Sequence, residues 1–227
     1  MNNQKIFVLL TGGNLSEDFL CQYYKTHPEL EHAEIICVDK GVESIRKIGR
    51  APDYIIGDFD STNPSQVLEW EENFHGDEER FIRLNPVKDE TDTHAAILFA
   101  LQHGAETIYI FGAMGGRMDH FLGNVNLLMI PLKQGVEAYL VDEQNRICLK
   151  DQGFTIAREE CFGTYISFLP ITEKVTHVTM RGFRYEVEDI TMTIGTSLGV
   201  SNEVAKDSAT IEWEDGIFIV VESKDKG

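Results

Sequence analysis

Tyr54-Ile55-Ile56-Gly57-Asp58-Phe59-Asp60-Ser61-Thr62 joins a short apolar run to a pair of aspartates. The apolar run has the length and composition of a buried strand. Two carboxylates this close raise each other's pKa or recruit a cation, and Mg²⁺ accepts one or two carboxylates together with water and phosphate oxygens. Asp, Ser and Gly also favour solvated turns. The stretch therefore predicts a strand whose end either turns in solvent or holds a divalent metal.

The same alternation of apolar run and amphipathic segment extends from Lys5 to about Val141. Apolar runs that predict strands are Ile6–Leu10, Ile35–Val38, Tyr54–Ile56, Phe81–Leu84, Ile108–Phe111 and Ala138–Val141. Segments with helical periodicity are Ser16–Tyr24, Ser65–Asn73, Thr93–Gln102 and His120–Leu132. Strands that alternate with helices predict an α/β domain, with a parallel sheet covered by helices on both faces.

After about Asp142 the period changes from helical to alternating. Strands are predicted at Arg146–Lys150, Thr164–Phe168, Val175–Met180, Thr191–Ile194, Ala209–Trp213 and Ile217–Val221. Asp215-Gly216, between the last two, predicts a hairpin. We therefore expect an α/β domain over residues 1–142 and a small antiparallel β-sandwich over residues 146–227.

Composition limits the function. The chain has 227 residues, 42% of them hydrophobic, and a formal net charge of −18. This charge argues against binding to nucleic acid or to an anionic membrane surface, because a protein that binds either of them needs a basic face. The four cysteines form no C-x-x-C pair, and the N-terminal apolar run is too short for a signal peptide or a membrane span. We expect a cytoplasmic protein with reduced thiols.

Clusters of polar and glycine residues follow five predicted strands in turn. They are Thr11–Asn14, Asp39–Gly41, Asp58–Asp60, Asn85–Asp92 and Gly112–His120. The ends of parallel strands meet at one edge of the sheet, and open α/β sheets bind ligands there. We therefore expect one site built from loops that are far apart in the chain.

Glycines and cations in these loops suit phosphate groups. Gly12-Gly13 and Gly115-Gly116 each precede a predicted helix, whose N-terminus favours anions, although such pairs are also common in simple turns. Neither pair matches a P-loop or a dinucleotide fingerprint. Arg117 can grip phosphate oxygens with its planar fork and Lys88 supplies a mobile charge, unless both are ordinary surface cations.

Three further carboxylates, Asp89, Asp92 and Asp119, join Asp58 and Asp60 at this edge. Asp92 is also a candidate N-cap of the helix that follows it. His120 is either a base or a residue that packs locally. Carboxylates, cations and glycine-rich turns together predict a Mg²⁺-dependent nucleotide enzyme of the phosphoryl-transfer kind.

Several motifs follow one another in a fixed order. They are Asp39-x-Gly41, Gly57-Asp58-Phe59-Asp60-Ser61, Lys88-Asp89-x-Thr91-Asp92, Gly115-Gly116-Arg117-x-Asp119-His120 with Asn124, and Ser201-Asn202-Glu203. Their order and spacing resemble the thiamine pyrophosphokinase (thiamine diphosphokinase) family. The resemblance is dense over residues 10–126 and sparse in the C-terminal part.

The resemblance implies an ATP- and Mg²⁺-dependent enzyme that transfers diphosphate to the hydroxyethyl group of thiamine, giving thiamine diphosphate and AMP. It also implies a homodimer with the active site near the subunit interface. The implied catalytic residues are Asp58, Asp60, Asp92, Arg117 and Asp119, with Asp58, Asp60 and Asp92 on the metal. The implied nucleotide contacts are Gly12, Gly13, Asp39, Lys88, Asp89, Thr91, Gly115, Gly116, Arg117 and His120. The implied thiamine contacts are Asn124, Ser197, Ser201 and Asn202.

Some assignments stay open at this point. Asp39-Lys40-Gly41 departs from the Asp-Gly-Gly that the family often has, and either Ser197 or Ser201 is the thiamine contact. Trp213 either packs in the core or stacks on the thiazolium ring. The alternative functions are a catalytically silent nucleotide or thiamine sensor, and a pyrophosphokinase that acts on a different alcohol.

Overall fold

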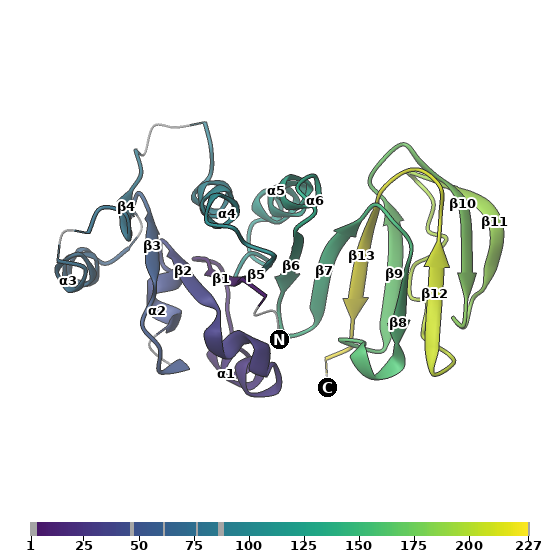
Figure 1. Cartoon of the computed structure of the whole chain (residues 1–227), viewed down its shortest axis with the longest axis horizontal. Coiled ribbons are helices and arrows are strands. Elements are labelled where there is room, and N and C mark those ends of the chain that lie inside the picture. The colour runs from purple at the N-terminus through teal and green to yellow at the C-terminus, as the bar shows by residue number, and fades with distance from the viewer. Residues whose placement is uncertain (1–3, 46–47, 61, 76, 86–88, 227) are drawn as a thin grey trace. The chain divides into compact units, whose positions relative to one another are not determined.

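The computed structural model describes residues 4–45, 48–60, 62–75, 77–85 and 89–226. The chain divides into two compact units, Met1–Glu143 and Gln144–Gly227, here called the α/β unit and the β unit (Figure 1). None of the helices described is both long and apolar enough to cross a bilayer. All four cysteines are free thiols, and Cys37 and Cys148 are buried.

The α/β unit is built on six strands whose mutual pairings are all parallel. Their order is β4-β3-β2-β1-β5-β6. The central strand β1 is buried at every position, as expected for a strand covered on both faces. The bounds are β1 Ile6–Leu10, β2 Glu34–Val38, β3 Tyr54–Gly57, β4 Phe81–Arg83, β5 Thr107–Phe111 and β6 Glu137–Val141. The predicted parallel sheet is confirmed.

Helices cover both faces of this sheet. Phe19 of α1 packs against Phe111 of β5, and Phe99 of α4 packs against Tyr54 of β3. The strand register places Phe111 and Tyr54 on opposite faces, because Phe111 aligns through Leu10 and Cys37 with the residue after Tyr54. The helices are α1 Glu17–Thr26, α2 Gly41–Ile45, α3 Pro64–Asn73, α4 Asp92–Gln102, α5 Met118–Leu127 and α6 Met129–Leu132, with a 3₁₀ turn at Pro28–His32.

The predicted helix His120–Leu132 is wrong as one element. It is two helices, α5 and α6, that meet at Leu128. Pro131 explains the break, because proline has no N–H to donate to the carbonyl of Leu127 and its ring clashes with that carbonyl. The short helix α2 was not predicted, since five residues that begin with glycine carry little periodicity.

The β unit contains two antiparallel sheets. One has the order β7-β13-β9 and the other β11-β10-β12-β8. Phe168 of β9 lies 6.3 Å from Phe154 of β8 and 5.5 Å from Phe183, measured between ring centroids, so the two sheets share an aromatic core. The strands are β7 Asn145–Lys150, β8 Phe154–Ala157, β9 Tyr165–Pro170, β10 Lys174–Arg181, β11 Val187–Thr193, β12 Ser208–Glu212 and β13 Phe218–Ser223. The predicted sandwich is confirmed.

The predicted hairpin at Asp215-Gly216 is wrong. β12 pairs with β10 and β8, whereas β13 pairs with β7 and β9, so this turn carries the chain from one sheet to the other. Gly216 has φ +104°, a conformation that only glycine adopts easily. The sequence therefore predicted correctly that the chain turns here. Turn residues indicate a reversal, but they do not choose the strand that pairs. The four-residue strand β8 was not predicted.

Candidate functional site

The site lies where the strand order of the α/β unit reverses. Chain order runs outward from β1 to β2, β3 and β4 on one side, and β5 and β6 lie on the other side. The connections that follow β1 and β5 therefore run in opposite directions along the sheet, and such a switch point is the usual ligand position in open α/β sheets. A cavity of about 570 Å³ opens there.

Most of the edge residues predicted from the sequence meet in this cavity. They are Gly12, Gly13, Asp39, Thr91, Asp92, Gly115, Gly116, Arg117, His120 and Asn124. Residues in the same wall that had not been assigned a ligand contact are Thr11, Asn14, Val38, Lys40, Thr93, Gly112 and Ala113. The proximity of Thr11, Asn14 and Lys40 to predicted residues in the same loops was the available signal. Lys88 lies outside the described residues.

The glycine loops form one wall of the cavity by close backbone packing. A Cβ placed on Gly13 would overlap the carbonyl oxygen of Gly112, so the loops after β1 and β5 touch here main chain to main chain. Gly112 itself has φ +75°. Asn124 donates from Nδ2 to the carbonyl of Ala113 at 2.8 Å and so ties α5 to the same loop. Asn124 was predicted as a thiamine contact, and in the structure its side-chain amide makes this hydrogen bond within the protein.

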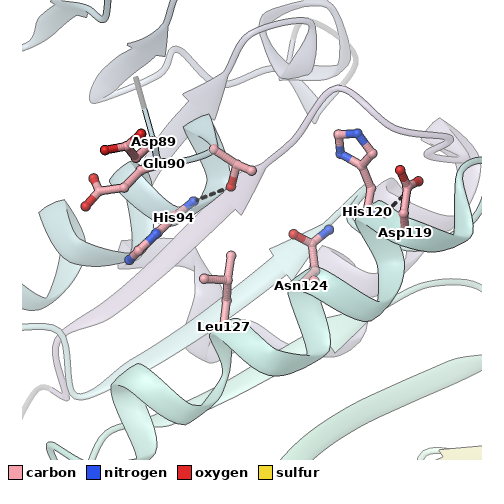
Figure 2. Close-up of a pocket in the computed structure, with 9 residues that line it drawn as sticks. Asp89, Glu90, His94, Asp119, His120, Asn124 and Leu127 are labelled. Carbon is pink, nitrogen blue, oxygen red and sulfur yellow. Dashed lines mark hydrogen bonds between the residues drawn. The ribbon is translucent and has the colours of Figure 1, made fainter. Parts of the chain in front are cut away.

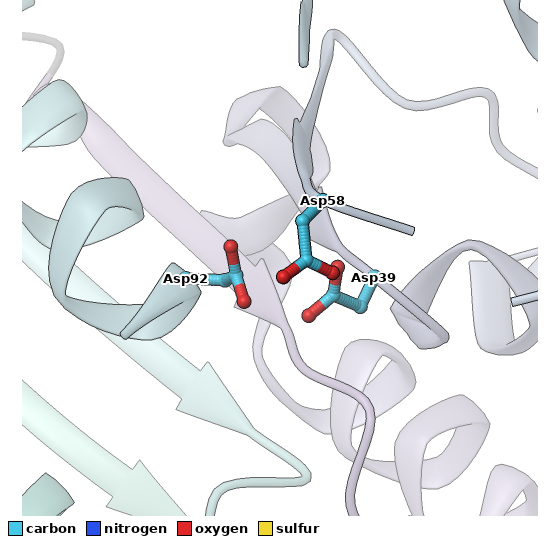
Figure 3. Close-up of side chains that lie close together, drawn as sticks. All are labelled: Asp39, Asp58 and Asp92. Carbon is cyan, nitrogen blue, oxygen red and sulfur yellow. The ribbon is translucent and has the colours of Figure 1, made fainter. Parts of the chain in front are cut away.

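Three carboxylates converge beside this cavity. One oxygen from each of Asp39, Asp58 and Asp92 lies within 4.8 Å of the others. Figure 3 shows the three side chains pointing toward one another from the end of β2, the end of β3 and the start of α4. We call them the acidic group. All three are half-buried, so water screens their mutual repulsion only in part.

Local structure fixes each member of the acidic group. Asp39 has φ +48°, a left-handed conformation that aspartate tolerates better than most residues, and its Oδ1 accepts from the Phe59 amide at 3.4 Å. Asp92 is the first residue of α4, where the helix dipole favours a negative charge. The N-cap of α4 is Thr91, whose Oγ1 accepts from the His94 amide at 3.2 Å, so the alternative interpretation of Asp92 as the cap is wrong.

The acidic group is electrostatically unfavourable by itself. Burial, together with the neighbouring carboxylates of Asp92 and Asp58, raises the pKa of Asp39 to about 7, although the hydrogen bond from the Phe59 amide opposes this shift. A divalent cation between the three carboxylates would remove this repulsion, and oxygen donors of this kind suit Mg²⁺. The residues present therefore fit a magnesium ion.

Asp60 does not belong to the acidic group among the described residues. Its side chain is exposed, and its main-chain N–H donates to Asp58 Oδ1 at 3.1 Å. The resemblance implied Asp39 as a nucleotide contact, and its place beside Asp58 and Asp92 was missed because it depends on the direction of its side chain. The predicted role of Asp60 as a metal ligand stays a prediction.

Arg117 and Asp119 form an exposed ion pair at the start of α5. The Arg117 guanidinium donates to Asp119 through Nε at 3.1 Å and Nη2 at 2.6 Å. These hydrogen bonds hold the pKa of Asp119 at about 2, well below its usual range. Asp119 is therefore ionised at neutral pH and is a poor proton acceptor. Arg117 keeps three of its five N–H donors for another anion.

A second pocket of about 330 Å³ adjoins the first between α4 and α5. Figure 2 shows Asp89, Glu90 and His94 on one side of it, and Asp119 and the side chains of α5 on the other. Thr91, His120 and Asn124 line both cavities. The predicted residues Asp89 and Asp119 thus border this second pocket and not the first.

The predicted thiamine residues of the β unit have separate surroundings. Ser197 and Asn202 line a pocket of about 210 Å³, and Ser201 is absent from its lining. Ser201 has φ +56°, and its amide donates to Ser167 Oγ at 3.0 Å. Trp213 donates from Nε1 to the Gly216 carbonyl and packs edge-on against the buried ring of Phe218, which favours its role in the core.

This fold and this site define a class of protein: α/β proteins that bind an anionic ligand, together with a divalent cation, at the switch point of a parallel sheet. Two family models identify the family. The model described as "Thiamin pyrophosphokinase, catalytic domain" matches residues 27–140, and "Thiamin pyrophosphokinase, vitamin B1 binding domain" matches residues 153–218. The chain belongs to the thiamine pyrophosphokinase family.

Individual relatives agree with this assignment. A thiamine pyrophosphokinase of Bacillus subtilis is 35% identical over 203 residues, covering 86% of this chain and 89% of the relative. The crystal structure of a thiamine pyrophosphokinase from Bacillus subtilis matches 98% of this chain and 100% of its own with a TM-score of 0.85 and 32% identity. That of Geobacillus thermodenitrificans matches 98% and 99% with a TM-score of 0.81 and 29% identity.

Proposed function

We propose that this chain is a thiamine diphosphokinase that transfers diphosphate from ATP to the hydroxyethyl group of thiamine, giving thiamine diphosphate and AMP. Membership of the family and the relatives named above support this activity. The observation that carries the proposal for this chain is the acidic group beside a glycine-walled cavity at the sheet's switch point. Three half-buried carboxylates next to a cavity walled by glycine loops are the arrangement that a metal–nucleotide enzyme needs.

We place Mg²⁺ between Asp39, Asp58 and Asp92. When bound, the ion would neutralise these carboxylates and the triphosphate and make the phosphorus more electrophilic. The loops of Gly12-Gly13 and Gly115-Gly116 let the main chain approach the phosphates, and the N-termini of α4 and α5 favour their charge. Arg117, fixed at the cavity wall by Asp119, directs its remaining N–H donors at phosphate oxygens.

In the reaction, the hydroxyl oxygen of thiamine forms a bond to the β-phosphorus of ATP while the bond from that phosphorus to the bridging α-β oxygen breaks. AMP leaves with the electron pair, and the hydroxyl proton passes to a base. Asp92 and Asp119 were the two candidates for this base. The low pKa of Asp119 makes it a poor proton acceptor, and the carboxylate of Asp92 would share its charge with Mg²⁺, so we assign the base to neither residue.

The activity is tested by incubating the full chain with ATP, thiamine and Mg²⁺ and separating the products. We expect AMP and thiamine diphosphate in equal amounts. ADP with thiamine monophosphate would contradict the proposal. Thermal stabilisation by ATP or thiamine without release of AMP would instead identify the sensor, and faster turnover of a competing alcohol would identify a different substrate.

Replacing Gly57 with alanine is expected to raise the Mg²⁺ concentration for half-maximal activity by at least about tenfold, the scale on which disturbed ligand orientation weakens metal sites. A Cβ on Gly57 would overlap Asp39 Oδ1 and push that carboxylate out of the acidic group. A Mg²⁺ titration of the initial rate measures this, with the melting temperature as the folding control. An unchanged Mg²⁺ requirement in a folded variant would remove Asp39 from the proposed site.

Two further expectations belong to this proposal. The homodimer, with its active site near the subunit interface, is supported by the family resemblance, and sedimentation at low protein concentration tests it. The cytoplasmic location stays a prediction.

A further inference from the structure

Lys40, in the loop after β2, lines the 570 Å³ cavity of the α/β unit and has no role so far. Among the described residues of the lining, Lys40 and Arg117 are the lysine and arginine side chains, and they face the carboxylates of Asp39 and Asp92. The whole chain has a formal net charge of −18. Such a field repels an anionic nucleotide unless local cations offset it. The cations of this wall therefore decide how well it holds a phosphate group.

The two cations differ in their partners. Arg117 donates two hydrogen bonds to Asp119, at 3.1 and 2.6 Å, so its charge is partly balanced within the protein. Within the part of the chain that the structure describes, Lys40 forms no ion pair with any carboxylate, those of the acidic group included. Its side chain is exposed. The three N–H donors of its ammonium group are therefore available to an anion in the cavity.

The main chain at Lys40 is fixed although its side chain is exposed. The Lys40 carbonyl accepts from the Glu43 amide at 2.9 Å, in the turn that begins α2. A Cβ on Gly41 would overlap the carbonyl oxygen of Leu10, so the loop after β2 packs main chain to main chain against the end of β1. The lysine side chain therefore starts from a fixed point in the cavity wall, which favours specific binding.

Lys40 and Arg117 lie on opposite sides of the first glycine loop. The sheet order β2-β1-β5 places the loop of Gly12-Gly13 between the loops that carry the two cations. On the β2 side, a Cβ on Gly12 would lie 3.2 Å from the Cβ of Lys40. On the β5 side, a Cβ on Gly13 would overlap the carbonyl oxygen of Gly112, in the loop that leads to Arg117. The glycine pair thus has a lysine beside it on one side and an arginine on the other.

We propose that Lys40 is a second phosphate-binding cation of this cavity, and that its ammonium group binds the triphosphate of the nucleotide from the β2 side while Arg117 binds it from the β5 side. This inference rests on the proposed function, because it names a further residue of the same nucleotide site. Three carboxylates would largely balance a bound Mg²⁺, so the charge of a triphosphate needs further cations. A lysine suits this task, because its compact charge on a flexible stem can follow phosphate oxygens.

The test is an equilibrium titration of the full chain with ATP and Mg²⁺ in the absence of thiamine. Lys40→Met keeps the aliphatic stem beside Gly12 and removes the charge. We expect it to raise the Kd for ATP about tenfold, near the lower end of the effect of one hydrogen bond to a charged group. Lys40→Arg keeps the charge and is expected to stay within about threefold of the wild type. An unchanged Kd in Lys40→Met would overturn the inference.

Lys25→Met is the matched control. Lys25 is also exposed and belongs to the same unit, but it lies outside the lining of the cavity. The substitution makes the same change in net charge, so it measures how far the overall field affects an anion. We expect the Kd for ATP to change by less than about twofold. Equal losses in Lys25→Met and Lys40→Met would show that Lys40 acts only through net charge, against the inference.

Adenosine separates a phosphate contact from a contact to the base or the ribose. Its inhibition constant against ATP should be the same in the wild type and in Lys40→Met, because adenosine has no phosphate for the ammonium group to bind. If the variant loses affinity for adenosine as much as for ATP, Lys40 contacts the nucleoside and the phosphate assignment is wrong.

Steady-state kinetics keep this inference apart from the proposed function. We expect Lys40→Met to raise the KM for ATP and to leave the KM for thiamine unchanged. If the wild type forms thiamine diphosphate and AMP while Lys40→Met binds ATP as tightly as the wild type, the inference fails and the proposed function stands. If the wild type binds ATP in the Lys40-dependent way described but releases no AMP with thiamine, the assigned activity fails and Lys40 keeps its place in the nucleotide site.

Discussion

Replacement of Asp58 by asparagine is expected to lower kcat at least about a hundredfold, the scale of one lost electrostatic contact in a transition state. Asp58 shares the acidic group with Asp39 and Asp92, within 4.8 Å, and the loss of one negative charge weakens the hold on Mg²⁺. Asparagine has nearly the same shape, so the loop after β3 should keep its conformation. Product formation at saturating ATP, thiamine and Mg²⁺ measures the effect.

Asp60→Asn is the matched comparison, because it makes the same chemical change two residues away. Asp60 is exposed and contributes its main-chain N–H to Asp58, a bond that the substitution leaves intact. We expect a smaller loss than in Asp58→Asn. If Asp60→Asn is equally inactive, Asp60 joins the metal ligands as the sequence predicted; if Asp58→Asn keeps near-normal turnover, the acidic group is not the metal site.

Replacement of Glu222 by glutamine is expected to lower the free energy of unfolding of the β unit by about 3 kcal/mol, the lower end of the cost of breaking a buried ion pair. Glu222 on β13 accepts from Arg146 Nε at 2.7 Å and Nη2 at 2.9 Å, and from the Phe162 amide at 2.9 Å. The side chains are 7% and 18% exposed, so the substitution leaves the Arg146 charge poorly solvated.

Urea unfolding followed by Trp213 fluorescence measures this loss. A Trp70→Phe background makes Trp213, in the β unit, the reporter. Glu188→Gln is the matched control, because Glu188 pairs with Arg181 while both side chains are largely exposed, at 76% and 58%. Exposed pairs contribute about 0–1 kcal/mol. Equal effects of the two substitutions would show that the Arg146–Glu222 pair is no stronger than a surface pair.

Much of the fold could be predicted from local pattern. The apolar runs around β1, β2, β3 and β5 are short and continuous, most of them are separated by amphipathic helices, and this pattern strongly indicates a parallel sheet. The failure at the predicted hairpin came from a non-local interaction. Asp215-Gly216 reverses the chain, yet the partner of β13 is chosen by the packing of two sheets. The break at Leu128 had a local cause in Pro131.

The candidate site was predictable as a location. Loops that follow parallel strands must emerge at one edge, so the order of strands and helices along the chain is enough to bring Gly12, Asp92 and Arg117 together. The membership of the acidic group was not predictable in the same way. It depends on the side-chain directions of Asp39 and Asp58, set by a left-handed residue and by the absence of a Cβ on Gly57.

The sequence by itself determined the class of the two units, the edge at which the loops gather and the family, because strand periodicity, turn residues and motif order are local properties. Only the tertiary structure decided that Asp39 lies beside Asp58 and Asp92. It also decided that Asp119 holds Arg117, and that the side-chain amide of Asn202 is hydrogen-bonded to the main chain of Tyr185. Each of these depends on where side chains from separate strands end in space, and that position is fixed by packing and hydrogen bonding across the whole unit.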